Sequence, residues 1–250
     1  MNLNLNYGYG EKALSLENIV LFSDKKLFEI DYLLFVDSRG LVNNSDKFEC
    51  SYIYLLKKRL DLRGLSYLII SRPKNLTIFS TIFNFLQLNS NLKFKYLITN
   101  LGLVDCTPKK QDNIDDIILQ LRQFSNRNYY LAEYEEYRLH SGNVEFLKSI
   151  EYSEKYIIEL NTFLESKFEK LYFLNTPIIS EDIKIDRERP RSFFTKLYKT
   201  NELVDNIVNL NKKKNILIDI KELTYTYDGV HYTKEGHQLI YNRIKESIHL

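Results

Sequence analysis

Three residues that can act together in nucleophilic catalysis stand far apart in this sequence. Ser38 directly follows an apolar run at 32–36, and Asp228 lies three residues before His231 near the other end of the chain. A serine hydroxyl is a weak nucleophile at neutral pH and needs a base within hydrogen-bond reach. That base works best when a carboxylate fixes its tautomer and stabilises its cation. These residues therefore predict Ser38 as nucleophile, His231 as base and Asp228 as its orienting group.

The alternative for Ser38 is an ordinary turn after a strand. Asp37, Ser38 and Gly40 are all residue types that turns prefer. If Ser38 ends the first strand of a parallel sheet and the Asp228–His231 segment follows the last strand, both groups emerge at the same sheet edge. This pairing favours the nucleophile over the plain turn.

Buried apolar runs alternate with amphipathic helical patterns along the chain. Such an alternation predicts βαβ units and a parallel sheet. The expected strands are 32–36, 67–70, 94–99, 170–174 and 215–220. The expected helices are 48–62, 76–88, one around 114–121, 157–168, one through 203–210 and a last one capped by Thr233.

Two segments stand outside this alternation. Residues 1–17 are polar and rich in Asn and Gly, which favours a loose N-terminal arm before a short edge strand at 18–22. Residues 125–142 carry four tyrosines among charged residues without a clean period, which favours an insertion or an irregular helix-loop. This insertion is either a lid or a packing surface, and the whole chain of 250 residues is expected to form a single domain.

Composition narrows the class of protein. The chain is 44% hydrophobic and 27% charged, as in globular proteins, and its 35 basic and 33 acidic residues leave no excess suited to nucleic acid. Cys50 and Cys106 form neither a metal-type pair nor a disulfide framework, and no export signal or membrane-length apolar run is visible. We expect a cytoplasmic protein without a membrane span, a bound metal or a cofactor.

Around Ser38 and in the segment from Asp228 to His231, the sequence resembles the SGNH hydrolases, also called GDSL esterases and lipases. The family's first block, Gly-Asp-Ser after the first strand, is similar to Val36-Asp37-Ser38, with Val in place of Gly. Its last block, Asp-x-x-His before a Gly-containing helix start, is matched by Asp228-Gly-Val-His231 and by Gly236. The resemblance runs from about residue 32 to the end of the chain, and it implies a three-layer α/β/α sandwich of the flavodoxin-like SGNH fold with about five parallel strands.

The blocks that supply the family's oxyanion hole differ here. The third block, Gly-x-Asn-Asp, resembles Gly102-Leu-Val-Asp105, in which Val104 replaces the oxyanion-binding Asn. The resemblance makes Gly102 and Asp105 candidates for the oxyanion and substrate site. The second-block Gly has no counterpart in the loop 71–75. Besides the Ser38 N–H, Asn100 or Asn75 could supply a substitute amide. The alternative for each of them is a hydrogen-bonding role within its own loop. Losing one oxyanion donor typically costs about 100- to 1000-fold in rate.

Basic residues follow several of the expected strands. If the topology is right they gather at the catalytic edge, where a basic rim would attract an anionic substrate such as a phosphorylated, nucleotide-linked or carboxylated sugar. The alternative is scattered, solvated charge. Arg39 and Arg72 lie in the first two of these loops and are the candidates for substrate binding. The full set is Arg39, Arg72, Lys74, Lys109, Lys110, Arg187, Arg189 and Arg191.

Three functions remain open at this point. The resemblance favours a serine ester hydrolase that removes an O-acyl group, in particular O-acetyl, from a sugar or a small anionic substrate. Transfer of the acyl group to a glycan would use the same three residues. A glycan-binding or assembly protein that has lost catalysis would keep the fold without the oxyanion donors. The sequence predicts no oligomeric state.

Overall fold

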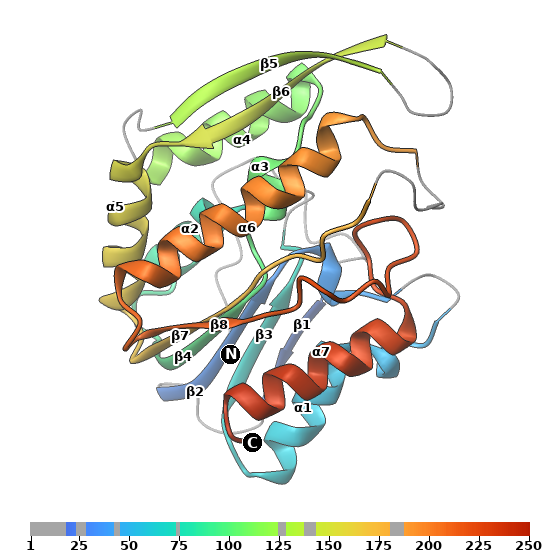
Figure 1. The fold of residues 1–250 in the computed structure, drawn as a ribbon. Coiled ribbons are helices and arrows are strands. Elements are labelled where there is room, and N and C mark those ends of the chain that lie inside the picture. Colours follow the sequence, from blue (N-terminus) through green and yellow to red (C-terminus); the bar gives the residue numbers. More distant parts are fainter. Residues whose placement is uncertain are drawn as a thin grey trace.

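The computed structural model describes residues 19–23, 29–42, 46–73, 76–124, 129–137, 144–180 and 188–250. Its centre is a six-stranded sheet in the order β1-β3-β2-β4-β7-β8 (Figure 1). Five strands run parallel, and β1 pairs antiparallel to β3 at one edge. The strands are β1 (Ile19–Phe22), β2 (Glu29–Val36), β3 (Tyr67–Ser71), β4 (Lys93–Thr99), β7 (Lys170–Leu174) and β8 (Asn215–Ile218).

Helices cover both faces of this sheet. One face packs against α1 (Tyr52–Leu62) and α7 (Lys234–Ser247), which lie side by side in Figure 1. The other face packs against α2 (Phe79–Leu88), α5 (Glu154–Glu165) and α6 (Ser192–Leu210). A further helix, α4 (Gln111–Phe124), packs against α2. The three-layer α/β/α sandwich with five parallel strands is therefore confirmed, and the parallel strands follow the flavodoxin-like order.

Strand β2 shows why the sequence forms this sheet. Successive side chains of a strand point to opposite faces. Leu33 and Phe35 enter the core beneath α2, α5 and α6, whereas Leu34 and Val36 enter the core beneath α1 and α7. Because all four are buried, the strand reads as a continuous apolar run, which is typical of a parallel strand covered on both faces.

Two predicted helices begin later than the apolar pattern alone suggested. The segment 48–62 divides into a short 3-10 turn, Phe48–Cys50, and helix α1, because the Ser51 hydroxyl accepts a hydrogen bond from the Tyr54 N–H and caps the helix. Helix α2 likewise begins at Phe79. The expected loop after β4 contains a short helix, α3 (Leu103–Cys106).

The tyrosine-rich segment differs from the expected irregular helix-loop. Its described part, Tyr129–Tyr137, is strand β5, which pairs antiparallel with β6 (Val144–Tyr152) as a separate two-stranded sheet. Strand β6 lies against α3 and α4, at the top of Figure 1. Leu147 and Ile150 of β6 are buried, so this strand is packed onto the domain. Whether the hairpin also acts as a lid stays a prediction.

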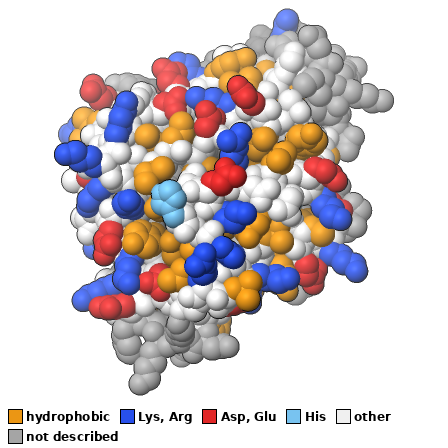
Figure 2. All heavy atoms as spheres, turned by 60° about the horizontal axis from the view of Figure 1, so that its bottom comes forward, with side chains coloured by type: hydrophobic (Ala, Val, Ile, Leu, Met, Phe, Trp, Pro, Cys, Tyr) orange, Lys and Arg blue, Asp and Glu red, His pale blue; other side chains and the backbone are white. Residues whose placement is uncertain are grey.

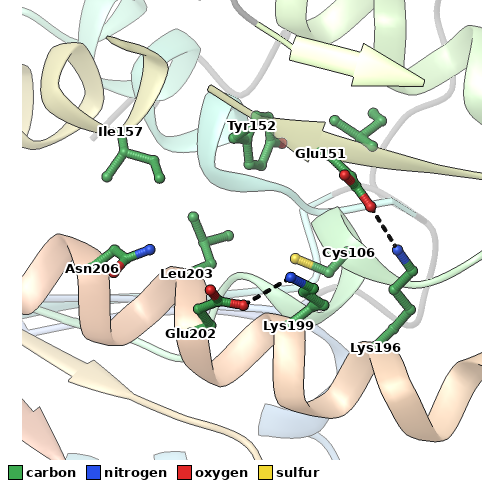
Figure 3. A pocket seen from close by; sticks show the side chains of 10 residues that line it. Cys106, Glu151, Tyr152, Ile157, Lys196, Lys199, Glu202, Leu203 and Asn206 are labelled. Atoms are coloured by element: carbon green, nitrogen blue, oxygen red, sulfur yellow. Dashed lines mark hydrogen bonds and ion pairs between the residues drawn. The ribbon is translucent and has the colours of Figure 1, made fainter. Parts of the chain in front are cut away.

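A cavity of about 150 Å³ lies between β6, α5 and α6 (Figure 3). Its charged side chains are paired with each other: Lys196 contacts Glu151 at 3.1 Å, and Lys199 contacts Glu202 at 3.0 Å. The rest of its lining is mostly apolar, with Cys106, Ile150, Tyr152, Ile157, Leu203 and Asn206.

The described part of the face drawn in Figure 2 has no single dominant charge. The face seen in Figure 2 carries basic and acidic side chains interspersed with apolar ones, in keeping with the formal net charge of +2. Within the described ranges, no helix is both long and apolar enough to cross a membrane. The expected N-terminal arm, 1–17, lies outside the described residues.

Candidate active site

Ser38 lies in a tight turn at the carboxyl end of β2. The turn is a short 3-10 helix, Ser38–Gly40, and the Asp37 carboxylate caps it by accepting the Arg39 N–H at 2.8 Å. Gly40 sits where a Cβ atom would approach Val36 Cγ2 to 2.7 Å. The close packing against β2 therefore needs glycine at this position. Because β2 lies between β3 and β4, at the switch point of the sheet, Ser38 stands where such folds form their ligand crevices.

Ser38, His231 and Asp228 are connected by hydrogen bonds. The Ser38 Oγ and His231 Nε2 are 2.9 Å apart, and the His231 Nδ1 and Asp228 Oδ2 are also 2.9 Å apart. With the Nδ1–H donating to the carboxylate, Nε2 is left to accept the serine proton. Three residues that the sequence separates by up to 193 positions thus form one continuous chain of contacts.

The loop between β8 and α7 builds the acidic end of this chain. Asp228 Oδ1 accepts the backbone N–H groups of Val230 at 3.0 Å and His231 at 2.8 Å, while Gly229 adopts φ +81°. Burial disfavours the charged carboxylate, but its hydrogen bonds to His231 and the nearby cations outweigh burial and hold the Asp228 pKa well below its ordinary value. Asp228 is therefore ionised throughout the neutral range.

Arg189 also binds Asp228, a contact that sequence reasoning missed. Its Nη2 lies 2.9 Å from Asp228 Oδ2 and 3.0 Å from the Asp228 main-chain oxygen, and its Nε donates to that same oxygen at 3.1 Å. The sequence placed Arg189 only among the loop cations. Its 39-residue separation from Asp228 leaves no local pattern that would have revealed the pair.

Arg39 and Asn100 are buried beneath Ser38, so their expected roles in substrate binding are wrong. The Arg39 guanidinium is 1% exposed; it pairs with Asp37 at 2.9 Å and donates to the Asn100 carbonyl. The Asn100 side chain accepts the Asp37 N–H at 2.9 Å and donates to Asp37 Oδ1 and to Tyr52. These side chains fix the turn that carries Ser38 to the end of β4, and their donors are either bonded within the protein or, like Arg39 Nη1, buried.

The two ends of the segment Gly102–Asp105, which resembles the third block, lie in different surroundings. Gly102, with φ +120°, begins α3, and the next residue, Leu103, packs in the same apolar cluster as Val230, so this loop lies close to the His231 loop. The Asp105 carboxylate instead turns inward: its Oδ1 accepts the Tyr152 hydroxyl at 2.7 Å and the Phe79 N–H at 3.1 Å. Because Asp105 is 1% exposed, its expected role near the oxyanion is wrong.

The loop after β3 supplies no oxyanion donor in its described part. The Arg72 N–H continues the sheet ladder by donating to the Val36 carbonyl at 2.8 Å, and Pro73 has no N–H. Arg72 adopts φ +49°, the left-handed region that favours glycine. Its side chain is partly exposed, so a contact with substrate stays a prediction. Asn75 lies outside the described residues.

The predicted basic rim is smaller than the sequence suggested. Arg39 and Arg189 are bound to Asp37 and Asp228, and the buried Lys109 donates to carbonyls of its own loop. Lys74 and Arg187 lie outside the described residues. No cluster of three or more His, Cys, Asp or Glu side chains suited to a metal ion is found in the described part of the chain.

His237 is not a second base for Ser38. It is fully buried in α7, where its Nδ1 accepts the Tyr52 N–H at 3.4 Å. Burial lowers the His237 pKa to about 4, so the imidazole is neutral near pH 7. The residue holds α7 against the start of α1, beneath the loop that carries His231.

No protein-family model matches the sequence, and no curated protein matches it. The fold is similar to those of solved structures. A member of the lipolytic G-D-S-L family from Veillonella parvula aligns with a TM-score of 0.51 and 10% identity, over 87% of this chain and 97% of that one. An acetylxylan esterase from Geobacillus stearothermophilus aligns with a TM-score of 0.50 and 10% identity, over 90% and 97%. At such identities the likeness is one of fold.

Proposed function

We propose that this chain, whose fold is that of the SGNH or GDSL esterases, is a serine esterase with Ser38 as its nucleophile. The observation that carries the proposal is the hydrogen-bonded series from Ser38 through His231 to Asp228, with 2.9 Å at each step. A fold alone does not define an activity, because many functions share one architecture. The side-chain geometry is therefore the main argument.

The reaction follows from the orientation of these groups. Ser38 Oγ attacks the acyl carbonyl carbon while its proton passes to His231 Nε2, and the resulting imidazolium is stabilised by Asp228. His231 then gives the proton to the departing alcohol oxygen as the ester C–O bond breaks, which leaves the acyl group on Ser38. A water molecule, deprotonated by His231, attacks this acyl-enzyme and releases a carboxylic acid. The proton returns to Ser38.

Stabilisation of the oxyanion is the weak part of this site. The Ser38 N–H has no hydrogen-bond acceptor among the described residues and is free to face the oxyanion. Val104 has no side-chain amide, and the side-chain amide of Asn100 is already bonded to Asp37 and Tyr52. Since one missing donor typically costs about 100- to 1000-fold in rate, we expect slow turnover of simple esters.

We further propose an O-acetylated sugar as the substrate. The support is the shared fold with a protein whose name assigns it to acetylxylan. Transfer to a sugar hydroxyl would use the same acyl-enzyme, and only the acceptor that resolves it would differ. Adding a sugar acceptor to the reaction distinguishes the two, because transfer raises the yield of acylated sugar at the expense of free acetate.

The first test is hydrolysis of a small aryl acetate by the unchanged protein and by Ser38→Ala. We expect the Ala variant to lose about 10⁴-fold or more in kcat, because the nucleophile is removed while the fold is kept. A fluorophosphonate should label Ser38 in the unchanged protein, as detected by mass spectrometry of the peptide. His231→Gln should prevent this labelling, since the serine then has no base.

The scarcity of oxyanion donors favours one other function, a glycan-binding protein without catalysis. The same experiment separates it from the esterase. A protein that neither hydrolyses the aryl acetate nor reacts with the fluorophosphonate is not an esterase. Binding of acetylated oligosaccharides that is unaffected by Ser38→Ala would then support the binding function.

A further inference from the structure

The Arg189 guanidinium binds both the side-chain carboxylate and the main-chain carbonyl of Asp228. Its guanidinium reaches Asp228 Oδ2 at 2.9 Å and the Asp228 carbonyl at 3.0 and 3.1 Å, so the residue cannot rotate or shift without losing these contacts. The guanidinium also lies over the Phe193 ring, with its Cζ 4.8 Å from the ring centre. Both partners are largely buried, with the Arg189 side chain 12% exposed and the Asp228 side chain 7% exposed.

Arg189 and His231 share one carboxylate oxygen. Asp228 Oδ2 lies 2.9 Å from Arg189 Nη2 and 2.9 Å from His231 Nδ1, while Oδ1 receives the two backbone N–H groups of the loop. One carboxylate oxygen thus binds the guanidinium and the imidazole at once, so the guanidinium that fixes this oxygen also fixes the acceptor of His231 Nδ1.

We propose that Arg189 is a positioning residue of the catalytic group: it fixes Asp228 in the orientation in which the Asp228 carboxylate binds His231 Nδ1. The inference rests on the proposed esterase function. In this arrangement Arg189 keeps the geometry of the Asp228–His231 pair rigid.

Other contacts hold the His231 ring itself. The Tyr227 ring stacks on the imidazole with centroids 5.8 Å apart, and the Ser38 hydroxyl contacts its other nitrogen. These contacts orient the ring, whereas Arg189 acts on the carboxylate that the ring binds.

The test compares Arg189→Gln, Arg189→Lys and the control Arg191→Gln, whose side chain is exposed. In Arg189→Gln, kcat should fall about ten- to hundredfold with KM little changed, because Asp228 is less well fixed. Arg189→Lys should recover only part of this loss, since Lys keeps the charge and loses the planar fork. Arg191→Gln should change neither kcat nor KM.

NMR of the His231 imidazole provides a readout that does not depend on activity. Its ring signals should differ between Arg189→Gln and the unchanged protein, because the carboxylate that binds Nδ1 is no longer held, and should stay the same in Arg191→Gln. Unmoved ring signals and an unchanged kcat in Arg189→Gln would overturn the inference even if the unchanged protein is an active esterase. Moved ring signals in a protein without esterase activity would leave the positioning of Asp228 intact and overturn the proposed function. If Arg189→Gln does not fold, an unchanged kcat in Arg189→Lys overturns the positioning role.

Discussion

At the scale of single residues, the position of Ser38 depends on a glycine two residues later. A Cβ atom at Gly40 would lie 2.7 Å from Val36 Cγ2 and 2.8 Å from Ser71 Oγ, both at the ends of neighbouring strands. The turn can approach the sheet this closely only with glycine. The same closeness brings Asp37 within reach of Ser71, whose hydroxyl donates to the Asp37 carbonyl at 3.2 Å.

We expect Gly40→Ala to destabilise the fold by about 1–3 kcal/mol, because the added methyl group overpacks a closed site. It should also lower kcat on an aryl acetate, since the turn that carries Ser38 must shift. Gly64→Ala is the matched control: Gly64 follows α1 with φ +64°, so alanine costs stability there through backbone strain. Urea unfolding should show a loss in both variants. Equal kcat values in the two variants would contradict the link between Gly40 and the nucleophile.

At the scale of elements, Asp105 connects three of them. It belongs to α3, and its carboxylate binds the Phe79 N–H at the start of α2 and the Tyr152 hydroxyl at the end of β6. Burial raises the Asp105 pKa from its ordinary value of 3.8 to about 6, although both hydrogen bonds and Lys109 oppose the shift. The hairpin is thus attached to the domain through an acid that is costly to ionise.

This shift has a defined sign for stability. Between pH 3.8 and about 6 the folded state binds a proton at Asp105 that the unfolded state has released, so this group makes stability fall as pH rises. Asp105→Asn keeps an acceptor for both donors and removes the titration. Urea unfolding from pH 4 to pH 7 should therefore show stability that declines less with rising pH in the Asn variant. Parallel pH dependences for the two proteins would contradict the assignment.

At the scale of the whole molecule, sequence and structure agree where the signal is local. The five parallel strands were predicted because each is an apolar run bounded by polar residues, and α7 because Thr233 caps it. The pairing of Ser38 with His231 followed from the topology of parallel sheets. The prediction that Asn100 and Asp105 line the oxyanion site was wrong, because the sequence does not show whether a polar side chain faces outward or binds a buried neighbour.

The hairpin and Arg189 were missed for a related reason. Strand β5 has glutamates where a half-buried strand usually has apolar residues, so its period is obscured in the sequence Tyr-Tyr-Leu-Ala-Glu-Tyr-Glu-Glu-Tyr. Arg189 differs from its neighbouring arginines only by what it meets after folding. Tertiary packing, which no local pattern in the sequence encodes, determines both the pairing of β5 with β6 and the contact of Arg189 with Asp228.

At the scale of the whole molecule, the buried His237 makes stability depend on pH in the direction opposite to Asp105. Burial lowers the His237 pKa from 6.5 to about 4, so in this range the unfolded state binds the additional proton and stability falls as pH falls. We expect His237→Asn, whose side chain can still accept the Tyr52 N–H, to lose less stability than the unchanged protein between pH 6.5 and pH 4. Asp105 acts in the opposite direction over part of this range. The slope of stability against pH in the unchanged protein should therefore lie between the slopes of Asp105→Asn and His237→Asn. Urea titrations at several pH values measure all three.

The long path between Ser38 and His231 also has a consequence for synthesis. The two residues are 193 positions apart, and a ribosome adds about 5–20 residues per second, so roughly 10 to 40 s separate their appearance. During that interval the nucleophile has neither its base nor the α7 helix that supports the base. The nascent chain therefore carries Ser38 without its hydrogen-bond partner, and the series from Ser38 to Asp228 can form only after the loop between β8 and α7 has been synthesised.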